Sequence, residues 1–369
     1  MKQILLAFFV LMVVVIGGLA ATNAIATKNA NLTLGSEKDL SLLSKGVKWT
    51  PDGHISYVTL PKGIRRYFIS GNQKTYTVDV PTSLSLTEAI SKNLSIKENF
   101  GPDKNVSYRN FYATIDSALQ TEPKNLNHLI AFAQYEEQAR KPDGTNDYSN
   151  FTASIGLLES YDGGETWQDF GPVIKGEDYL PPGTKITGAG QPSAIIKDGY
   201  VYVYFVDWAS GAKVSHPDEI YLARTKISPN GSLGTFEYLS TNGFYENTAA
   251  LKPAITIPEG SNAGYVSLPS VSYNKYLNQY LAVFETNIGF YSSTSFDGIN
   301  WNNKQLFLSF VKPQSERQEG DVWISYPTLL SDDSEKTDGT TKSTGNLYYG
   351  KGIWPNTAHQ LTVASFELK

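Results

Sequence analysis

A short motif that occurs twice constrains the fold of this chain more than any other feature. Residues 160–167 read Ser-Tyr-Asp-Gly-Gly-Glu-Thr-Trp, and residues 295–301 read Ser-Phe-Asp-Gly-Ile-Asn-Trp. The Asp side chain can accept backbone N–H groups in a tight turn, and Gly tolerates the positive φ that such turns require. The motif therefore predicts a turn between two antiparallel strands, which the Trp covers with apolar surface.

The composition agrees with many short strands joined by turns. The 369 residues include 31 Gly, 18 Pro, 23 Tyr and 17 Phe, and long helical periodicity is hard to find. There is no Cys, so no disulfide stabilises the fold. The formal charge of −5 and the lack of a basic stripe argue against nucleic acid or an anionic membrane as a partner.

The N-terminal segment has the pattern of a secretory signal peptide. Lys2 precedes an apolar run over residues 4–20, and small residues follow, including an A-x-A sequence at residues 24–26. We expect residues 1–26 to be the signal peptide, cleaved between Ala20 and Ala26, and residues 27–369 to form one domain of a secreted monomer. An uncleaved N-terminal anchor is the alternative, since the apolar run is near the lower limit for spanning a bilayer.

A second pattern reveals a repeat. Segments that combine Pro, then Ser or Thr, then an apolar run begin at Pro192, Pro269 and Pro327; Asp116 takes the place of Pro in a fourth, and Pro51 opens a looser fifth. An apolar stretch follows each start, at residues 65–69, 129–135, 200–206, 280–284 and 347–349. Five units of this size fill residues 27–369, and the alternating segment 360–368 is expected to close the ring.

This order predicts an all-β, five-bladed β-propeller of four-stranded antiparallel blades, with the repeated motif as the turn between the third and fourth strands. Strand direction then decides the faces. The first strand starts, and the second ends, on one face, which we call the axial face; the turn from third to fourth strand lies at the opposite end. Asp162 and Asp297 are therefore expected to be structural.

Acidic residues gather where axial-face positions are expected. Second strands end near Glu136, Asp207 and Glu285, and Asp116 starts a first strand. Converging carboxyls suit glycoside hydrolysis, in which one carboxyl donates a proton and another acts as base or nucleophile. We therefore take Asp116, Glu136, Asp207 and Glu285 as catalytic candidates, and further axial-face residues as substrate-binding candidates: Trp208, Gln191, Arg140, His216 and Trp323.

No metal site is predicted from side chains. The four His are scattered without the spacing of metal ligands, and Cys is absent. Strand-end carboxylates also bind Ca²⁺, so a calcium ion on the propeller axis stays an alternative.

Several of these segments resemble known families. The Pro-Ser starts, the run Asp198–Tyr204, the turn motif, and Tyr326-Pro327 with Leu347-Tyr348-Tyr349 are similar to five-bladed propellers of the glycoside hydrolase family 43-like superfamily. The turn motif itself resembles the Asp-box of sialidase-like BNR repeats. The family 43 resemblance implies an inverting hydrolase with an Asp base, matched best by Asp116, a second Asp that tunes it, and a Glu acid, matched by Glu285 or Glu136.

Departures from these families keep alternatives open. Residues 191–192 are Gln-Pro where the family 43-like enzymes have an Asp, and an E-G-P acid motif is not evident. A six-bladed sialidase is the alternative fold, but Arg is scarce and the R-I-P motif is missing. The main hypothesis is a secreted glycosidase acting on a carbohydrate; the rival is a non-catalytic propeller that binds glycan or protein through the same face.

Overall fold

The structure is a computed structural model that describes residues 30–141, 143, 145–176, 179–183, 186–208, 219–246, 251–332, 335–355 and 358–369. The signal-peptide prediction for residues 1–26 and His216 lie outside these residues. Within them, no helix is long and apolar enough to cross a membrane.

The described strands form five antiparallel groups of four, which confirms the all-β prediction and the arrangement of a β-propeller. Each group is given from its inner to its outer strand. The first group is β2 (Ser56–Leu60), β3 (Ile64–Gly71), β4 (Lys74–Pro81) and β5 (Lys97–Phe100). The second is β6 (Tyr112–Leu119), β7 (Leu129–Arg140), β8 (Asn146–Ser160) and β9 (Gln168–Ile174). The third is β10 (Thr187–Lys197), β11 (Tyr200–Asp207), β12 (Glu219–Ile227) and β13 (Leu233–Ser240). The fourth is β16 (Ser267–Asn274), β17 (Gln279–Glu285), β18 (Gly289–Ser295) and β19 (Asn302–Ser309). The fifth is β20 (Val322–Leu330), β22 (Thr344–Ile353), β23 (Gln360–Leu368) and β1 (Leu32–Leu40).

Short elements decorate these groups. Strands β14 (Gly243–Tyr245) and β15 (Ile255–Thr256) extend the third group, and β21 (Thr340–Thr341) pairs with β16. The helix α1 (Leu86–Ser91) and β5 account for the region 82–105, which the sequence pattern leaves undefined. The remaining helical turns are 3₁₀: η1 (Leu43–Lys45), η2 (Pro61–Gly63), η3 (Ser107–Arg109) and η4 (Gln314–Glu316).

The ring is closed by the two ends of the described chain. β1 pairs antiparallel with β23, from Leu32 opposite Leu368 to Leu40 opposite Leu361. The sequence pattern indicates β23 as the closing segment, but not that the outermost strand of the last group comes from residues 32–40.

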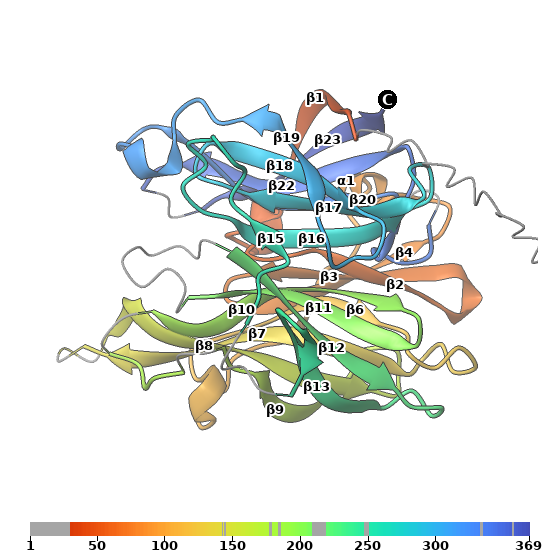
Figure 1. Ribbon diagram of the computed structural model, residues 1–369. Helices are drawn as coiled ribbons and strands as arrows, with labels where there is room; N and C mark the ends of the chain where they lie inside the picture. Colours follow the sequence, from red (N-terminus) through yellow and green to blue (C-terminus); the bar gives the residue numbers. More distant parts are fainter. Residues whose placement is uncertain are drawn as a thin grey trace, which may run out of the picture.

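The inner strands lie next to one another around the ring. β2 contacts β6, β6 contacts β10, β10 contacts β16 and β16 contacts β20. Figure 1 shows β10 and β16 side by side at the centre, with the outer strands β13 and β19 below and above them. A hydrogen bond from Ile55 N–H to Thr328 Oγ1, at 3.1 Å, completes the circle between the last group and the first.

The Ser and Thr of the repeated starts make these junctions. Each hydroxyl accepts the backbone N–H of the next inner strand: Ser117 from Ala194 (2.9 Å), Ser193 from Val271 (3.0 Å), Ser270 from Leu329 (3.3 Å) and Thr328 from Ile55 (3.1 Å). At the junction of the first and second groups, Thr75 on β4 accepts from Ile115 N–H at 2.6 Å. The Ser or Thr of the repeated pattern therefore supplies the hydroxyl that joins one group to the next.

The residues just before these hydroxyls bulge out of the ladders. Pairing skips between Ile115 and Ser117 on β6, and between Gly190 and Ser193 on β10. Equivalent skips occur on β16 and β20, and the bulged residues Gln191, Leu268 and Tyr326 have φ of 55°, 53° and 61°. A bulge re-aims the side chain it carries. Here three bulged side chains, Gln191, Leu268 and Tyr326, line a small pocket of about 10 Å³.

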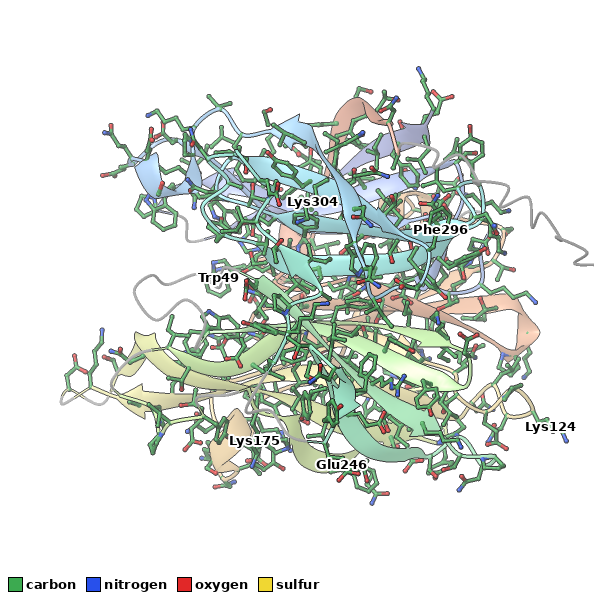
Figure 2. The ribbon with its side chains drawn as sticks, viewed as in Figure 1. Trp49, Lys124, Lys175, Glu246, Phe296 and Lys304 are labelled. Atoms are coloured by element: carbon green, nitrogen blue, oxygen red, sulfur yellow. The ribbon has the colours of Figure 1, made fainter. Side chains whose placement is uncertain are left out.

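The two turn motifs lie at the end opposite the axial face, as the strand order predicts. Gly163 N–H donates to Asn127 O in the β6–β7 connection, at 2.8 Å, so this turn lies where first strands end. Figure 2 shows Phe296, in the second motif, and Lys124, in the β6–β7 connection, on one side, and Trp49, which leads into the first group, on the other.

Hydrogen bonds within the motifs show that both carboxylates are structural. Asp162 Oδ1 accepts the N–H groups of Glu165 and Thr166, both at 3.0 Å, and Asp297 Oδ1 accepts those of Ile299 and Asn300, both at 2.8 Å. Burial acts to raise the pKa of Asp162, but hydrogen bonds from Thr166, Ser160 and Glu165 outweigh it and lower that pKa to about 2.

Removing a junction hydroxyl is expected to weaken the whole ring. Ser270→Ala leaves the buried N–H of Leu329 without its acceptor, which costs about 1–3 kcal/mol in the free energy of unfolding. Urea denaturation measures the loss. Ser309→Ala, at an exposed position on β19, is the control and should change stability by less than about 0.5 kcal/mol. Equal effects in the two variants would contradict the role given to the junctions.

The turn carboxylate should give a pH-dependent contribution to stability. Because the pKa of Asp162 is lower in the fold than in the unfolded chain, its contribution is complete above about pH 4 and is lost as the pH falls toward 2. Asp162→Asn should therefore lower the melting temperature above pH 4, with a deficit that shrinks between pH 4 and pH 2. Asp198→Asn, in the exposed β10–β11 turn, is the control. A deficit that does not change with pH would contradict this assignment.

Candidate functional site

Three carboxyls from the first and second groups crowd together on the axial face. Asp52 lies in the segment before β2, Asp116 bulges from β6, and Glu136 lies toward the end of β7. Asp116 and Glu136 are 1% and 8% exposed, whereas Asp52 is half-buried. Gly53 allows this approach: a Cβ at position 53 would lie 2.6 Å from Asp116 Oδ1.

Burial and mutual repulsion disfavour ionisation of these groups. Burial raises the pKa of Glu136 to about 7, and the charge of Asp52 adds to that rise. Burial raises the pKa of Asp52 to about 7 as well, although hydrogen bonds from Tyr326 and Tyr112 oppose it. The pKa of Asp116 is raised well above its usual range, first by burial and then by the charges of Asp52 and Glu136.

Each carboxyl is held by its own polar partners. Asp116 Oδ1 accepts from Thr114 Oγ1 at 3.0 Å. Glu136 accepts from Gln134 Nε2 at 2.9 Å. Tyr112 Oη donates to the backbone carbonyl of Asp52 at 2.5 Å and so fixes the segment that carries this carboxylate.

A fourth carboxyl, Glu285, lies at the end of β17 and faces β20. Tyr265 Oη donates to it at 2.9 Å, Gln314 Nε2 donates at 3.1 Å, and Ser325 Oγ also donates. Burial raises the pKa of Glu285 to about 7, against the effect of these hydrogen bonds and of the positive charge of Arg317.

Tyr326 connects Glu285 with the other carboxyls. It bulges from β20, and its hydroxyl acts to lower the pKa of Asp52 against the effect of burial. Its pKa is raised by burial and also by the charges of Asp52, Glu285 and Glu136, so all three carboxylates act on one hydroxyl. The axial site is therefore one electrostatic unit made by the first, second, fourth and fifth groups.

Aromatic rings form the rim beside Tyr326. The imidazole of His359 stacks on Tyr326, with ring centroids 5.6 Å apart, and Trp323 lies 4.5 Å from the same imidazole. Burial lowers the pKa of His359 to about 4, so this imidazole is neutral at neutral pH. Of these two rings His359 is buried, whereas Trp323 is partly exposed and offers a surface on which a sugar ring can stack.

The structure brings together three of the four predicted catalytic residues: Asp116, Glu136 and Glu285. Asp207, the fourth, lies at the end of β11 in the third group. Along β11, Val203 and Phe205 pack against the second group, while Val206 and Trp208 pack toward the fourth. Alternation thus turns Asp207 toward the second group, where a Cβ on Gly176 would lie 2.6 Å from Asp207 Oδ2.

The predicted binding residues have different surroundings. Trp323 is part of the aromatic rim, whereas Trp208 is buried, with its ring beside Gly190. Gln191 Oε1 accepts Leu268 N–H at 2.9 Å, so this side chain joins two inner strands. The backbone of Arg140 pairs with that of Asn146, but the Arg140 side chain is outside the described part of the structure. His216 lies entirely outside it.

Sequence reasoning missed Asp52, Tyr112, Tyr326 and Arg317 as site residues. Asp52 and Tyr326 each stand beside a Pro of a repeated start, and that position is the signal that could have identified them. Arg317 lies in an irregular connection after β19, and nothing in the repeat indicates its neighbours.

The described residues contain no group of three or more His, Asp or Glu arranged to hold a metal ion. A calcium ion on the axis stays an alternative, and the monomeric state stays a prediction.

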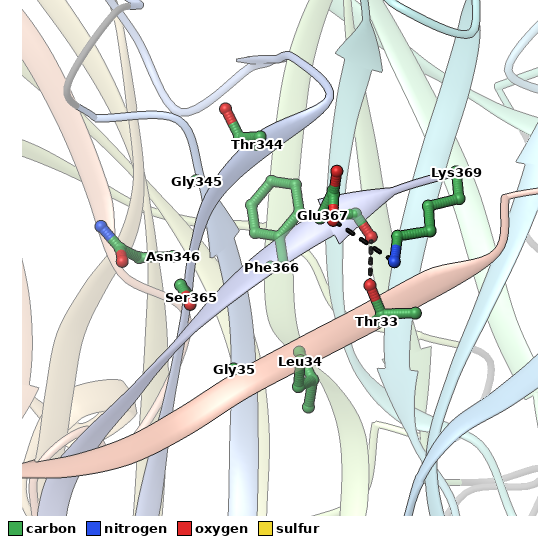
Figure 3. A pocket seen from close by; sticks show the side chains of 10 residues that line it. All are labelled: Thr33, Leu34, Gly35, Thr344, Gly345, Asn346, Ser365, Phe366, Glu367 and Lys369. Atoms are coloured by element: carbon green, nitrogen blue, oxygen red, sulfur yellow. Dashed lines mark hydrogen bonds and ion pairs between the residues drawn. The ribbon is translucent and has the colours of Figure 1, made fainter.

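A second hollow lies away from these carboxyls. It has a volume of about 660 Å³ and is lined by strands β1, β22 and β23 near the C-terminus (Figure 3). Its charged groups, Glu367 and Lys369, pair with each other at 3.5 Å, and Thr33 Oγ1 donates to the Glu367 carbonyl at 3.1 Å. It has none of the buried carboxyls of the axial site and is therefore not a candidate for acid–base chemistry.

No family model and no curated protein matches the chain. Among solved structures, the catalytic domain of a Coprinopsis cinerea GH62 α-L-arabinofuranosidase is similar at 11% identity and a TM-score of 0.49, over 92% of this chain and 97% of that chain. A Podospora anserina α-L-arabinofuranosidase in complex with cellotriose has 12% identity and a TM-score of 0.49, over 92% and 97%. A Xanthomonas citri GH43 enzyme complexed with xylotriose has 10% identity and a TM-score of 0.49, over 90% and 89%. Similarity of this degree does not establish an activity, which has to be argued from the side chains of this chain.

The raised pKa of Glu136 predicts the pH dependence of stability. The unfolded chain ionises Glu136 near pH 4.5 and the folded protein near pH 7, so this group lowers wild-type stability as the pH rises through that window. Glu136→Gln removes the effect. Its free energy of unfolding relative to wild type should rise between pH 4.5 and 7 by up to about 3 kcal/mol, and then stay level.

Urea denaturation at several pH values measures this difference. The matched control is Glu137→Gln, the next residue on β7, whose charge acts on Tyr179 instead of the carboxyl cluster. A flat difference for Glu136→Gln, or the same rise for Glu137→Gln, would contradict the electrostatic account.

Proposed function

We propose that this protein is a glycoside hydrolase that acts on a glycan through the carboxyls of its axial face. The observation that carries the proposal is the set of four carboxyls on that face, three of them with a pKa of about 7 and linked through Tyr326. Near neutral pH such a set contains both protonated and ionised members. Glycoside hydrolysis needs that combination, because one carboxyl donates to the leaving oxygen while another activates water or attacks.

The surroundings favour Asp52 as the base. A base must be ionised and must reach water, and Asp52 is half-buried with a pKa of about 7. Asp116, the match implied by resemblance, is 1% exposed and its pKa is raised well above the usual range. Asp116 is therefore better suited to tune its neighbours as a neutral group than to accept a proton.

Two residues are suited to the acid role. Glu285 and Glu136 each have a pKa raised to about 7, so a large fraction of each is protonated near neutral pH. Tyr326 connects Glu285 with the aromatic rim, whereas Glu136 lies beside Asp52. Substrates with different leaving groups separate the two, because the acid matters least when the leaving group is already a stable anion.

The proposal is tested by measuring hydrolysis of aryl glycosides and polysaccharides by the wild type and by Asp52→Asn, Glu136→Gln and Glu285→Gln. We expect the base variant and one Glu variant to lose about 100- to 10,000-fold in kcat/KM. The acid variant should regain activity on dinitrophenyl glycosides, and the base variant should not. The control is Asp198→Asn, at an exposed acid in the β10–β11 turn.

A protein that cleaves no member of the panel but binds glycans on an array would contradict the enzyme proposal and support the non-catalytic alternative. Full activity in all three cluster variants, or a loss of the same size in Asp198→Asn, would place the chemistry elsewhere.

A further inference from the structure

A second feature of the axial face concerns Arg317, in the connection between η4 and β20. Its guanidinium lies over the Trp354 ring at 4.7 Å and over the Trp323 ring at 5.9 Å. Its Nε donates to the Gln314 carbonyl at 3.2 Å. Trp354 is fixed by backbone bonds with Gly320 and Asp321, both at 2.8 Å, so this arginine lies in a preformed aromatic frame.

The guanidinium lacks a full set of partners. Its Nη1 is buried and has no hydrogen-bond partner, and no described carboxylate lies within 4.0 Å of Arg317. Glu285, Tyr265 and Asp321 act on Arg317 only through longer-range charge, and burial lowers its pKa. Buried polar groups in proteins are normally satisfied, and an unsatisfied donor at a functional site needs an explanation.

An unsatisfied acceptor lies next to this donor. Gln314 Nε2 donates to Glu285 and to the Ile324 carbonyl, and both are acceptors, so the orientation of this amide is fixed. Gln314 Oε1 is buried and has no partner. One charged donor and one neutral acceptor without partners therefore belong to the same short segment, and Gln314 connects this segment to the Glu285 carboxyl.

Both residues line a groove of about 240 Å³ between the fourth and fifth groups. Two further cations line it, but each has an acidic partner: Lys312 pairs with Asp321 at 2.7 Å, and Lys351 pairs with Glu37. Leu308, Phe310 and Ile324 give the groove an apolar wall. Arg317 is thus the cation of this groove whose charge is left for a ligand.

We propose that the groove binds a carboxylated sugar, so that the substrate of the axial site is a uronic-acid-containing glycan. The carboxylate accepts from Arg317, a hydroxyl of the same sugar donates to Gln314 Oε1, and the neighbouring glycosidic bond faces Glu285. The planar guanidinium fits a carboxylate in a bidentate manner, and both partners are desolvated, which makes such a bond stronger than a neutral one. This inference rests on the proposed glycoside hydrolase function, but it concerns binding and not turnover.

The test is a calorimetric binding measurement at fixed ionic strength. The probes are a glucuronic-acid-substituted xylo-oligosaccharide and a galacturonic acid trimer, each compared with its carboxyl-reduced, neutral form. Wild type is expected to bind at least one acidic probe roughly 10- to 100-fold more tightly than its neutral form. Arg317→Gln should abolish that preference, whereas Arg317→Lys, which keeps the charge without the fork, should retain part of it.

Arg224→Gln is the matched control. Arg224 also lies over aromatic rings, Tyr200 and Phe244, but its guanidinium already pairs with Glu237 at 2.8 Å. The control should keep the full preference for acidic probes. Near-UV circular dichroism checks that each variant is folded, and if Arg317→Gln is not, Arg317→Lys decides.

Equal binding of acidic and neutral probes by wild type, or an unchanged preference in Arg317→Gln, would overturn the inference. So would a sulfated galacto-oligosaccharide that binds through Arg317 when neither carboxylated probe does, or no binding of any probe. A wild type that shows no preference for acidic probes but hydrolyses neutral glycans would remove this inference alone. A clear preference for acidic probes in a protein that cleaves no glycan would contradict the hydrolase proposal and still support the uronate site.

Discussion

The hydroxyl-to-amide contact between neighbouring inner strands is the interaction on which the rest of this structure depends. Antiparallel ladders hold each group of four strands together, but they do not by themselves set one group against the next. Ser117, Ser193, Ser270 and Thr328 do so, because each hydroxyl accepts a backbone N–H of the following inner strand. The contribution of each is modest, about 1 kcal/mol, but together they fix the register around the ring.

The same short segments also create the site. Where the hydroxyl turns sideways to the next strand, the preceding residue leaves the ladder as a bulge. Asp116 and Tyr326 are bulged residues of this kind, and their side chains reach the cluster on the axial face. The bulged segments that join neighbouring groups therefore also bring ionisable side chains together and remove them from water. Their raised pKa values follow from that crowding and provide the acid–base chemistry proposed here.

Features that depend on residues close together in the chain could be predicted from the sequence, and features that depend on distant residues could not. Turn chemistry is local, so Ser160 and Asp162 could be assigned from sequence, and the hydrogen bonds of Asp162 confirm its structural role. Strand ends could be located from apolar runs, which gave Glu136 and Glu285. A one-residue difference at such an end reverses the direction of a side chain, so the strand end alone does not decide where Asp207 points. In the structure Asp207 lies on the side of β11 that packs against the second group.

The sequence by itself determined the strand order, the end of the molecule at which the turn motifs lie, and the repeated starts, because each depends on residues close together in the chain. Only the tertiary structure decided which carboxyls share one electrostatic environment, since Asp52 and Glu285 are brought to Tyr326 by closure of the ring. It also decided that Arg317 lies between Trp323 and Trp354 with a buried donor unsatisfied. Burial, mutual charge and missing partners are properties of three-dimensional neighbours, and no repeat in the sequence encodes them.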